Sequence, residues 1–411
     1  MQHTLTLDVE TTTFQKGNPF SRRNRLCTVG LLDDAGYRDF DIEYTNTPYG
    51  GKLQTIKEIV EASTLLIGFN IKFDLHWLRR YIDELSVHAV WDCQLAEFIL
   101  AQQSNPYPSL NDTLNLYGLE HKLDTVKLEY WDRGIDTTEI PWDILAEYQK
   151  RDIVGTREVF EIQKKRFEEG DPRLYEMFKL QCKDLLILQE MEFEGMVLDV
   201  ALANQEAEKL ESRLNNVRQS LSELADERIN WSSSDHISVF LYGGSIPFKV
   251  RIPTERVLKS GEVKVGEKWG TIDVEFPRLV KPLERSESAT TAKLSDEDIA
   301  RENQQRVRAG RRPIQRIYSV DEATLRGLKA RSKVARIIQL LLERAECEKL
   351  LSTYYRGIPN LITEMDWPAG EIHGQFNQCV AITSRLSSSR PNLQNLAGIT
   401  KALYISRYKD E

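Results

Sequence analysis

The sequence predicts an α/β domain with a mixed sheet, followed by a mainly helical region and a short β-containing end. Strand-like and helix-like segments alternate through residues 1–170, long helical patterns fill much of 171–356, and the pattern after residue 370 becomes β-like and irregular. A chain of 411 residues is long enough for two or three domains. We therefore expect domains at 1–170, 171–356 and 357–411.

The first domain begins with alternating apolar residues, which predict strands at 4–9 and 26–32. Asp34-Ala35-Gly36 predicts a turn into a strand at 39–44, which gives an antiparallel hairpin. Apolar residues three and four apart, and one short apolar run, predict helices at 53–62, 72–82, 92–101 and 142–167, and a buried strand at 65–69. Asn70 is a candidate N-cap for the second helix.

The second region begins after Gly170-Asp171-Pro172 with helical patterns at 174–192 and 201–226, separated by a stop at Glu194-Gly195. Residues 249–317 look like an insertion, with a small β element near its glycines and a stretch at 284–312 that is either loosely ordered or helical. A strong helix follows at 333–355, and a β-like segment at 373–376.

The composition is that of an ordinary globular protein, with 41% hydrophobic and 29% charged residues. No apolar run is long enough for a transmembrane helix, and the N-terminus carries neither a basic leader nor an apolar signal region, so we expect no membrane association and a cytoplasmic location. The five cysteines lie far apart without a CxxC pair, which fits a reducing compartment. The net charge is −8, yet residues 249–317 hold 16 Lys and Arg against 11 Asp and Glu, which is compatible with DNA binding.

Four acids and one tyrosine are the candidate catalytic residues. Asp8 and Glu10 are two apart on a predicted strand, so they point to the same face. Asp74 lies in the first turns of a predicted helix, and Tyr148 and Asp152 are four apart on another, which places both on one face. Taken separately, each segment has a structural interpretation as well: a solvated strand edge, an acid near a helix N-terminus, or the polar face of an amphipathic helix.

These motifs and their order along the chain resemble those of the DEDD superfamily of 3′–5′ exonucleases, tyrosine subtype. LTLDVETT, GFNIKFDLHWL and EYQKRD match the three motifs, and WDCQLAEFIL and SLNDTLNLYG resemble segments between them. The resemblance implies an RNase H-like domain with two divalent metal ions, Mg²⁺ or Mn²⁺. Asp8, Glu10 and Asp152 would hold one metal ion, Asp8 and Asp74 the other, and Tyr148 would align the attacking water.

The chemistry suits this set of residues. A phosphodiester repels hydroxide, and two metal ions about 4 Å apart lower the pKa of a bound water and offset charge on both axial oxygens. Four carboxylates close together repel one another unless cations fill the site. The resemblance therefore predicts a hydrolytic enzyme, a 3′–5′ exodeoxyribonuclease.

A second motif, TSRLSSSRPNLQNLA at 383–397, resembles the palm entrance of family A DNA polymerases. MEFEGMVLD, CEKLLSTYYRGI and EIHGQFNQ resemble the thumb start, the end of its long helix and the strand leading to the palm. The family pattern implies a helical thumb at 171–356, the beginning of the palm at 357–411, and proofreading in DNA replication. It also implies contacts with single-stranded 3′ ends and with the primer–template duplex. The DNA-contacting residues would be Arg385, Ser387, Ser388, Asn392 and Gln394, with Lys349, Thr353 and Arg356 at the thumb base.

The polymerase catalytic acids and the fingers of this family lie beyond the position that Glu411 matches. We therefore expect DNA synthesis to need a missing remainder or a partner chain. Three interpretations stay open: a fragment, one product of a split gene, or a stand-alone exonuclease. The family's 5′-nuclease domain is also absent at the front, which is typical of phage-like members and would place the protein in a host cytoplasm. The insertion at 249–317 could hold duplex DNA or a processivity partner, or be a tolerated surface loop.

Two rival functions remain. A DEDD ribonuclease would share the carboxylates but should lack RLSSSRPNLQN. The second rival is a DNA-binding subunit that has the nuclease fold but no enzymatic activity. The presence of all four acids counts against it.

Overall fold

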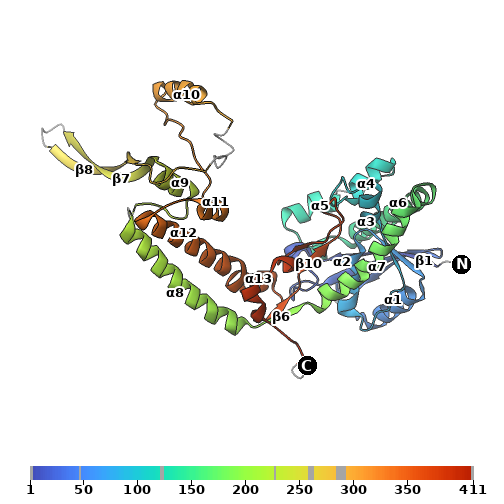
Figure 1. Cartoon of the computed structure of the whole chain (residues 1–411). Coiled ribbons are helices and arrows are strands. Elements are labelled where there is room, and N and C mark those ends of the chain that lie inside the picture. The colour runs from blue at the N-terminus through green and yellow to red at the C-terminus, as the bar shows by residue number, and fades with distance from the viewer. Residues whose placement is uncertain are drawn as a thin grey trace. The chain divides into compact units, whose positions relative to one another are not determined.

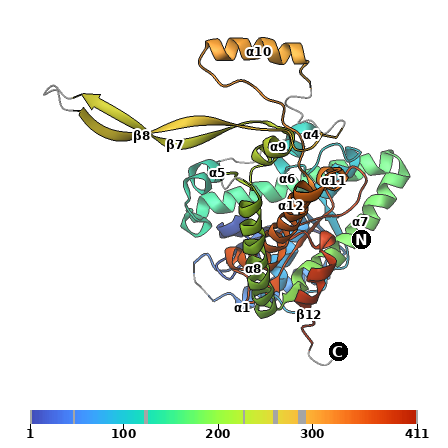
Figure 2. The ribbon, with the colours of Figure 1, turned by 60° about the vertical axis from the view of Figure 1, so that its left-hand side comes forward.

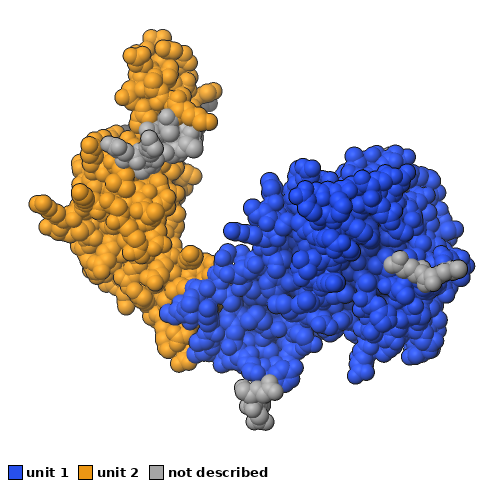
Figure 3. All heavy atoms as spheres, turned by 45° about the vertical axis from the view of Figure 1, so that its right-hand side comes forward, with its two compact units in different colours: residues 1–203, 356–411 blue, residues 204–355 orange. Residues whose placement is uncertain are grey.

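The computed structural model describes residues 3–45, 48–120, 125–225, 228–257, 263–283 and 293–408. The chain divides into two compact units (Figure 3). Unit 1 comprises residues 1–203 and 356–411, and unit 2 comprises residues 204–355. The predicted division into three domains stays a prediction.

Unit 1 is built on a five-stranded sheet with the strand order β3-β2-β1-β4-β5. Its strands are β1 (Thr4–Thr11), β2 (Leu26–Asp33), β3 (Gly36–Asp41), β4 (Leu65–Gly68) and β5 (Val90–Asp92). The central strand β1 pairs antiparallel with β2 and parallel with β4, so the predicted mixed sheet is confirmed. The predicted antiparallel hairpin is present, but its second strand begins at Gly36 rather than at residue 39, because a two-residue loop lets Gly36 pair with Asp33.

Helices surround this sheet (Figure 1). They are α1 (Gly50–Ala62), α2 (Ile71–Tyr81), α3 (Cys93–Leu100), α4 (Leu110–Tyr117), α5 (Thr125–Glu129), α6 (Trp142–Glu169) and α7 (Pro172–Glu194). The helix α6 buries residues three and four apart, and it packs on β1, β2 and β4. Leu5, Leu7 and Val9 of β1 lie in the main hydrophobic core.

The start of α2 corrects one detail of the sequence analysis. Asn70 occupies the N-cap position with φ of 61°, but its side chain makes no capping hydrogen bond. The carboxylate of Asp92 supplies this bond instead, because Oδ2 accepts from the Ile71 amide at 2.9 Å. Its Oδ1 also accepts from Leu95 N, so Asp92 holds the N-termini of α2 and α3 together. Asp92 ends strand β5 and is the N-cap of α3, so the helix predicted at 92–101 is present and begins one residue later, at Cys93.

The C-terminal part of unit 1 forms small sheets. β6 (Met196–Leu198) lies between β9 (Glu371–Ile372) and β12 (Tyr404–Ile405), and β10 (Gln375–Asn377) pairs with β11 (Ser387–Ser389). The helix α13 (Gly357–Met365) precedes them. Residues 371–389 therefore return to the region of α2 and α7, where they contribute to the site described below.

Unit 2 contains an antiparallel hairpin of long strands, drawn most clearly in Figure 2. Its elements are α8 (Val200–Leu224, which begins in unit 1), α9 (Ser234–Tyr242), β7 (Gly244–Val257), β8 (Val263–Phe276), α10 (Asp296–Arg308), α11 (Glu322–Gly327) and α12 (Ser332–Leu350). The β element is larger than predicted and begins before residue 249, because its base packs on α9 through Ile246 and Phe248. The predicted helix at 333–355 ends at Leu350 and continues as a π-helical turn, Leu351–Tyr355.

Of the stretch 284–312, residues 284–292 lie outside the described residues, and α10 is the helix in the rest. Among the helices that the structure describes, none is both long and apolar enough to cross a membrane.

Candidate active site

Three elements bring the five predicted catalytic side chains to one region of unit 1. The strand β1 carries Asp8 and Glu10, α2 carries Asp74, and α6 carries Tyr148 and Asp152. Both helices pack against β1. The packing of α2 and α6 on the central strand β1 therefore brings these residues together.

The face of β1 that carries Asp8 and Glu10 is separate from the face that carries its leucines. Strand alternation places Leu5, Leu7 and Val9 on one side and the two acids on the other. Asp8 pairs with Gly30 of β2. A Cβ atom on Gly30 would lie 2.4 Å from Cδ1 of Ile153, so the absence of a side chain lets α6 approach the sheet beside Asp8.

The Asp74 side chain is hydrogen-bonded to the backbone of β1. Its Oδ1 atom accepts a hydrogen bond from the Val9 amide at 3.1 Å, and the residue is only 4% exposed. Burial raises the pKa of Asp74 well above its ordinary value, and the negative charge of Asp8 raises it further. This acid therefore lies close enough to Asp8 for the two charges to repel each other.

Tyr148 and Asp152 lie on the buried face of α6, at 3% and 4% exposure. Burial raises the pKa of the Tyr148 phenol above its usual value, and the charges of Glu10, Asp152 and Asp8 add to this effect. The phenol is therefore neutral at physiological pH and can donate a hydrogen bond. Its electrostatic contacts include acids from both β1 and α6.

Gln149 fixes α6 against the sheet between these residues. Its Nε2 donates to the backbone carbonyl of Asp8 at 3.1 Å, and its Oε1 accepts from the Thr28 hydroxyl at 3.0 Å. Thr28 pairs with Glu10 in the β1–β2 ladder. One buried amide thus sets the position of α6 relative to both acids of β1.

The chemistry of the donor set suits a divalent cation. Carboxylate oxygens are the preferred ligands of Mg²⁺ and Mn²⁺, and a cation would relieve the repulsion that raises the pKa of Asp74. However, the described residues contain no group of three or more His, Cys, Asp or Glu side chains in a metal-holding arrangement. The predicted two-metal site therefore stays a prediction.

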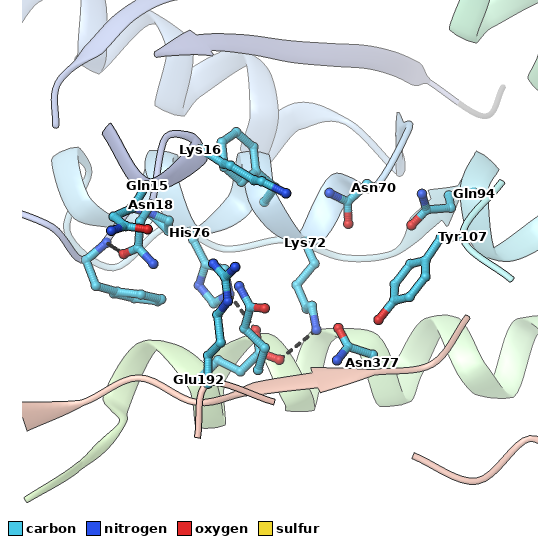
Figure 4. Close-up of a pocket in the computed structure, with 15 residues that line it drawn as sticks. Gln15, Lys16, Asn18, Asn70, Lys72, His76, Gln94, Tyr107, Glu192 and Asn377 are labelled. Atoms are coloured by element: carbon cyan, nitrogen blue, oxygen red, sulfur yellow. Dashed lines mark hydrogen bonds and ion pairs between the residues drawn. The ribbon is translucent and has the colours of Figure 1, made fainter. Parts of the chain in front are cut away.

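Unit 1 also holds a polar pocket of about 490 Å³, which shares the helix α2 with Asp74 (Figure 4). Phe73, next to Asp74, lines it. The other lining residues are mostly polar and come from the loop after β1, from α2, α3 and α7, and from the C-terminal segment; they include Gln15, Lys16, Asn18, Asn70, Lys72, His76, Gln94, Tyr107, Glu192, Gln375, Asn377 and Arg390. The cations Lys16 and Arg390 form no ion pair with any described residue.

Glu192 of α7 anchors one wall of the pocket and is 3% exposed. Its Oε1 lies 2.7 Å from Nζ of Lys72 and accepts from the Phe376 amide, while its Oε2 lies 2.9 Å from Nε2 of His76 (Figure 4). Burial opposes ionisation of Glu192, but the hydrogen bond with His76 and the charge of Lys72 prevail and lower its pKa. The carboxylate therefore ties α2, which carries Asp74, to β10.

The residues predicted to contact DNA differ in their exposure to solvent. Arg385, Asn392 and Gln394 are exposed, while Ser387 is half-buried in β11. Ser388 is buried, and its hydroxyl accepts from Leu393 N and donates to the Pro391 carbonyl, so it stabilises the turn after β11.

The three residues predicted at the thumb base lie elsewhere. Lys349 is exposed on α12, Thr353 is exposed in the π-helical turn, and Arg356 precedes α13. The contacts of all eight residues with DNA stay predictions.

Several pocket residues were not found by sequence reasoning, notably Asn70, Tyr107, Glu192, Asn377 and Arg390. Two of them stand within quoted motifs: Asn70 in GFNIKFDLHWL, where it was assigned only a capping role, and Arg390 in the serine–arginine motif, where it was assigned no role. The others come together through contacts across more than 100 residues of sequence, such as the hydrogen bond from Phe376 N to Glu192. A local motif search cannot detect such pairs.

Comparisons with known proteins agree with the polymerase resemblance. Residues 295–407 match the family described as DNA polymerase family A. DNA polymerase I of Synechocystis sp. is 27% identical over 332 residues, 80% of this chain and 26% of that protein. The DNA polymerase of Bacillus phage SP01 is 22% identical over 398 residues, 92% of this chain and 39% of its own. The resemblance to family A DNA polymerases, phage members included, is thus confirmed.

A solved structure shares the fold. It is the POL domain of Pol1 from M. smegmatis in complex with DNA primer-template and dNTP, with a TM-score of 0.59 and 16% identity, covering 97% of this chain and 53% of that one. The chain spans only about a quarter to two fifths of the length of the relatives above. The structural likeness therefore describes the fold of this chain, and the sequence relatives describe the family it resembles.

Proposed function

We propose that this chain carries a 3′–5′ exonuclease site that removes nucleotides from DNA 3′ ends, as the proofreading part of a family A DNA polymerase in replication. The observation that carries this proposal is the convergence of Asp8, Glu10, Asp74, Tyr148 and Asp152 on strand β1. The mixed sheet with its central antiparallel and parallel pairing fits an RNase H-like domain.

The four acids would hold Mg²⁺ or Mn²⁺, which would supply a more acidic water and offset the charge of the phosphodiester. The protein's own part is positioning. Asp74 is fixed by the Val9 amide, and Gln149 fixes α6 against β1. The neutral Tyr148 phenol can donate a hydrogen bond to a water or a phosphate oxygen without adding negative charge.

The polar pocket supports a nucleic-acid strand as the substrate. Its amides and the hydroxyl of Tyr107 suit bases and sugars, and Lys16 and Arg390 suit phosphates. The pocket reaches the helix that carries Asp74 through Phe73. A single-stranded 3′ end bound there would extend toward the carboxylates.

The polymerase resemblance supports DNA rather than RNA as the partner. The M. smegmatis structure was solved with a DNA primer-template. We extend this to Arg385, Ser387, Asn392 and Gln394 as contacts of the primer–template duplex, with Lys349, Thr353 and Arg356 at the thumb base. DNA synthesis, a second chain with the polymerase acids, and a processivity partner at 249–317 belong to the same proposal.

A silent nuclease fold and a ribonuclease would both carry the same acids. The experiment that separates the possibilities offers the purified chain 5′-labelled single strands of DNA and of RNA with the same sequence, with Mg²⁺ and with EDTA. We expect stepwise shortening of DNA from its 3′ end only with the metal. Preference for RNA would favour a ribonuclease, and intact strands with Mg²⁺ and with Mn²⁺ would favour a binding subunit.

A further inference from the structure

The two-stranded ribbon of unit 2, β7–β8, is exposed on both faces over its far part (Figure 2). Its base packs into the unit through Ile246 and Phe248. Every residue of β8 from Val263 to Trp269 is exposed, although successive positions alternate between the two faces. An isolated two-stranded ribbon is only marginally stable in water, so an exposed ribbon of this length favours a ligand that covers one face.

Trp269 is the aromatic side chain of this exposed part. The structure describes all seven tryptophans of the chain, and Trp269 alone among them is exposed, at 69%. The guanidinium of Arg251 lies 5.4 Å from the centroid of the indole and covers one face of the ring. Because so much of the residue is exposed, the opposite face of the ring is open to solvent. An open indole face is a surface on which an unpaired nucleobase can stack.

Two cations lie on the same face of the ribbon as Trp269. Arg251 is the cross-strand partner of Trp269, and Lys249, two residues earlier on β7, pairs with Thr271. Cross-strand partners share a face, and so do residues two apart on a strand. Lys249 is exposed and forms no ion pair with any described residue. Arg251 pairs with Glu267 at 3.2 Å, but both side chains are exposed, so this pair is weak. The face therefore offers two phosphate contacts beside one stacking surface.

The charge of the ribbon fits a polyanion. Residues 249–254 and 263–271 carry four cations, Lys249, Arg251, Lys264 and Lys268, against one acid, Glu267. The whole chain has a net charge of −8, so this exposed element is basic on an acidic protein. Unpaired bases suit the open indole better than a duplex does, because the bases of a duplex are already stacked on one another.

We propose that this face of the ribbon binds single-stranded DNA, with one base stacked on Trp269 and neighbouring phosphates on Lys249 and Arg251. The three residues belong to unit 2, and none of them belongs to the candidate active site or lines the polar pocket. The choice of DNA over RNA rests on the proposed function, but binding at the ribbon requires no hydrolysis.

The test is a titration of the full chain with a short oligo(dT) in EDTA, followed by tryptophan fluorescence. Stacking of a base on Trp269 should quench the emission saturably. Trp269→Phe should lose this quenching, since the other tryptophans are buried or half-buried. Lys249→Ala should raise the oligonucleotide concentration at half-quenching, and it should lower the slope of log affinity against log salt by about 0.7, the value for one phosphate contact on a single strand.

The matched control is Lys268→Ala, which removes the same charge next to Trp269 but from the opposite face of the ribbon. It should change the concentration at half-quenching less than Lys249→Ala does. An abasic strand of the same length carries the phosphates without bases and should not quench the emission.

The proposal would be overturned by an absence of saturable quenching, by quenching that persists in Trp269→Phe, or by equal effects of Lys249→Ala and Lys268→Ala. Equal quenching by the abasic strand or by a blunt duplex would overturn the stacking of an unpaired base, and tighter binding of oligo(U) would assign the ribbon to RNA. Because EDTA stops hydrolysis, these outcomes are separate from the exonuclease test, and either result can be positive while the other is negative.

Discussion

The Asp74 carboxylate accepts a hydrogen bond from the amide of Val9, the residue between Asp8 and Glu10 on the central strand. This single contact joins the second exonuclease-like motif to the first. It also places the buried Asp74 near Asp8. Burial raises the pKa of Asp74, and the negative charge of Asp8 raises it further. The arrangement is unfavourable without a cation, and it therefore gives measurable consequences for stability.

Asp74→Asn should raise the melting temperature of the metal-free protein at neutral pH. Asn keeps an oxygen for the Val9 amide but removes the charge that Asp8 opposes. Because the folded-state pKa of Asp74 is raised, its contribution to stability is present below the unfolded pKa and is lost as the pH rises through the folded pKa. The gain should thus shrink in acid, as thermal unfolding in EDTA between pH 4 and pH 8 would reveal. A destabilised variant at pH 8 would contradict this electrostatic account.

Tyr148→Phe should lower exonuclease turnover on the order of 100-fold, the usual effect of losing one well-placed hydrogen-bond donor. Strand binding should change little, since the phenol is buried among acids rather than along the pocket. Because its pKa is raised above the ordinary value of 10, activity between pH 6 and pH 9 should show no titration of this group. Steady-state kinetics against pH test both points, and an unchanged kcat would exclude a role in catalysis.

Gly30→Ala should destabilise unit 1 by about 1–3 kcal/mol, the typical result of overpacking. The new methyl would meet Cδ1 of Ile153 at 2.4 Å and the Gln149 side chain at 3.0 Å. Adding Ile153→Val removes that Cδ1 atom and should recover part of the loss. Urea unfolding of the single and double variants measures the effect, and strictly additive losses would show that the two positions do not interact.

Arg390→Ala should raise the KM for single-stranded 3′ ends, because Arg390 lines the polar pocket. The dependence of log affinity on log salt should lose about 0.7, the slope for one phosphate contact on a single strand. Arg385→Ala is the matched control from the other end of β11, since Arg385 does not line the pocket. It should leave single-strand hydrolysis unchanged and weaken only duplex binding. Equal effects of both variants on single strands would contradict the assignment.

Glu192→Gln should destabilise the protein by about 3 kcal/mol, near the lower end for breaking a buried ion pair, because the Lys72 side chain is 15% exposed. The loss comes mainly from the unpaired charge of Lys72. A second change, Lys72→Met, should therefore restore part of the stability. Thermal unfolding tests this coupling, and a double variant that is less stable than Glu192→Gln would argue against it.

The sequence was sufficient to predict which site residues share a face, because that follows from their spacing within one strand or helix. Asp8 and Glu10 share a face because they are two apart on a strand, and Tyr148 and Asp152 because they are four apart on a helix. The order of these motifs predicted their convergence. The mixed sheet also followed from the alternation of strands and helices along residues 1–170.

What the sequence could not predict depends on contacts between distant segments. Asp92 rather than Asn70 caps α2, because β5 ends next to the start of that helix. Glu192 pairs with Lys72 of α2 and accepts from Phe376 of β10, which lies 184 residues further along the chain. Nothing in its local pattern distinguishes it from an exposed helical acid. The length of the β7–β8 hairpin was also missed, since its interleaved glycines and charges weaken the strand pattern.

The most direct test of the account compares Asp8→Ala and Asp152→Ala with the unchanged chain on 5′-labelled single-stranded DNA in Mg²⁺. Asp112→Asn, an exposed acid on α4, is the control. We expect 3′ shortening by the unchanged chain and by the control. Both alanine variants should lose at least about 100-fold in rate, since losing even an outer-shell partner of a metal costs up to that much. Shortening at an equal rate by either alanine variant would contradict the assignment of these residues as the exonuclease site.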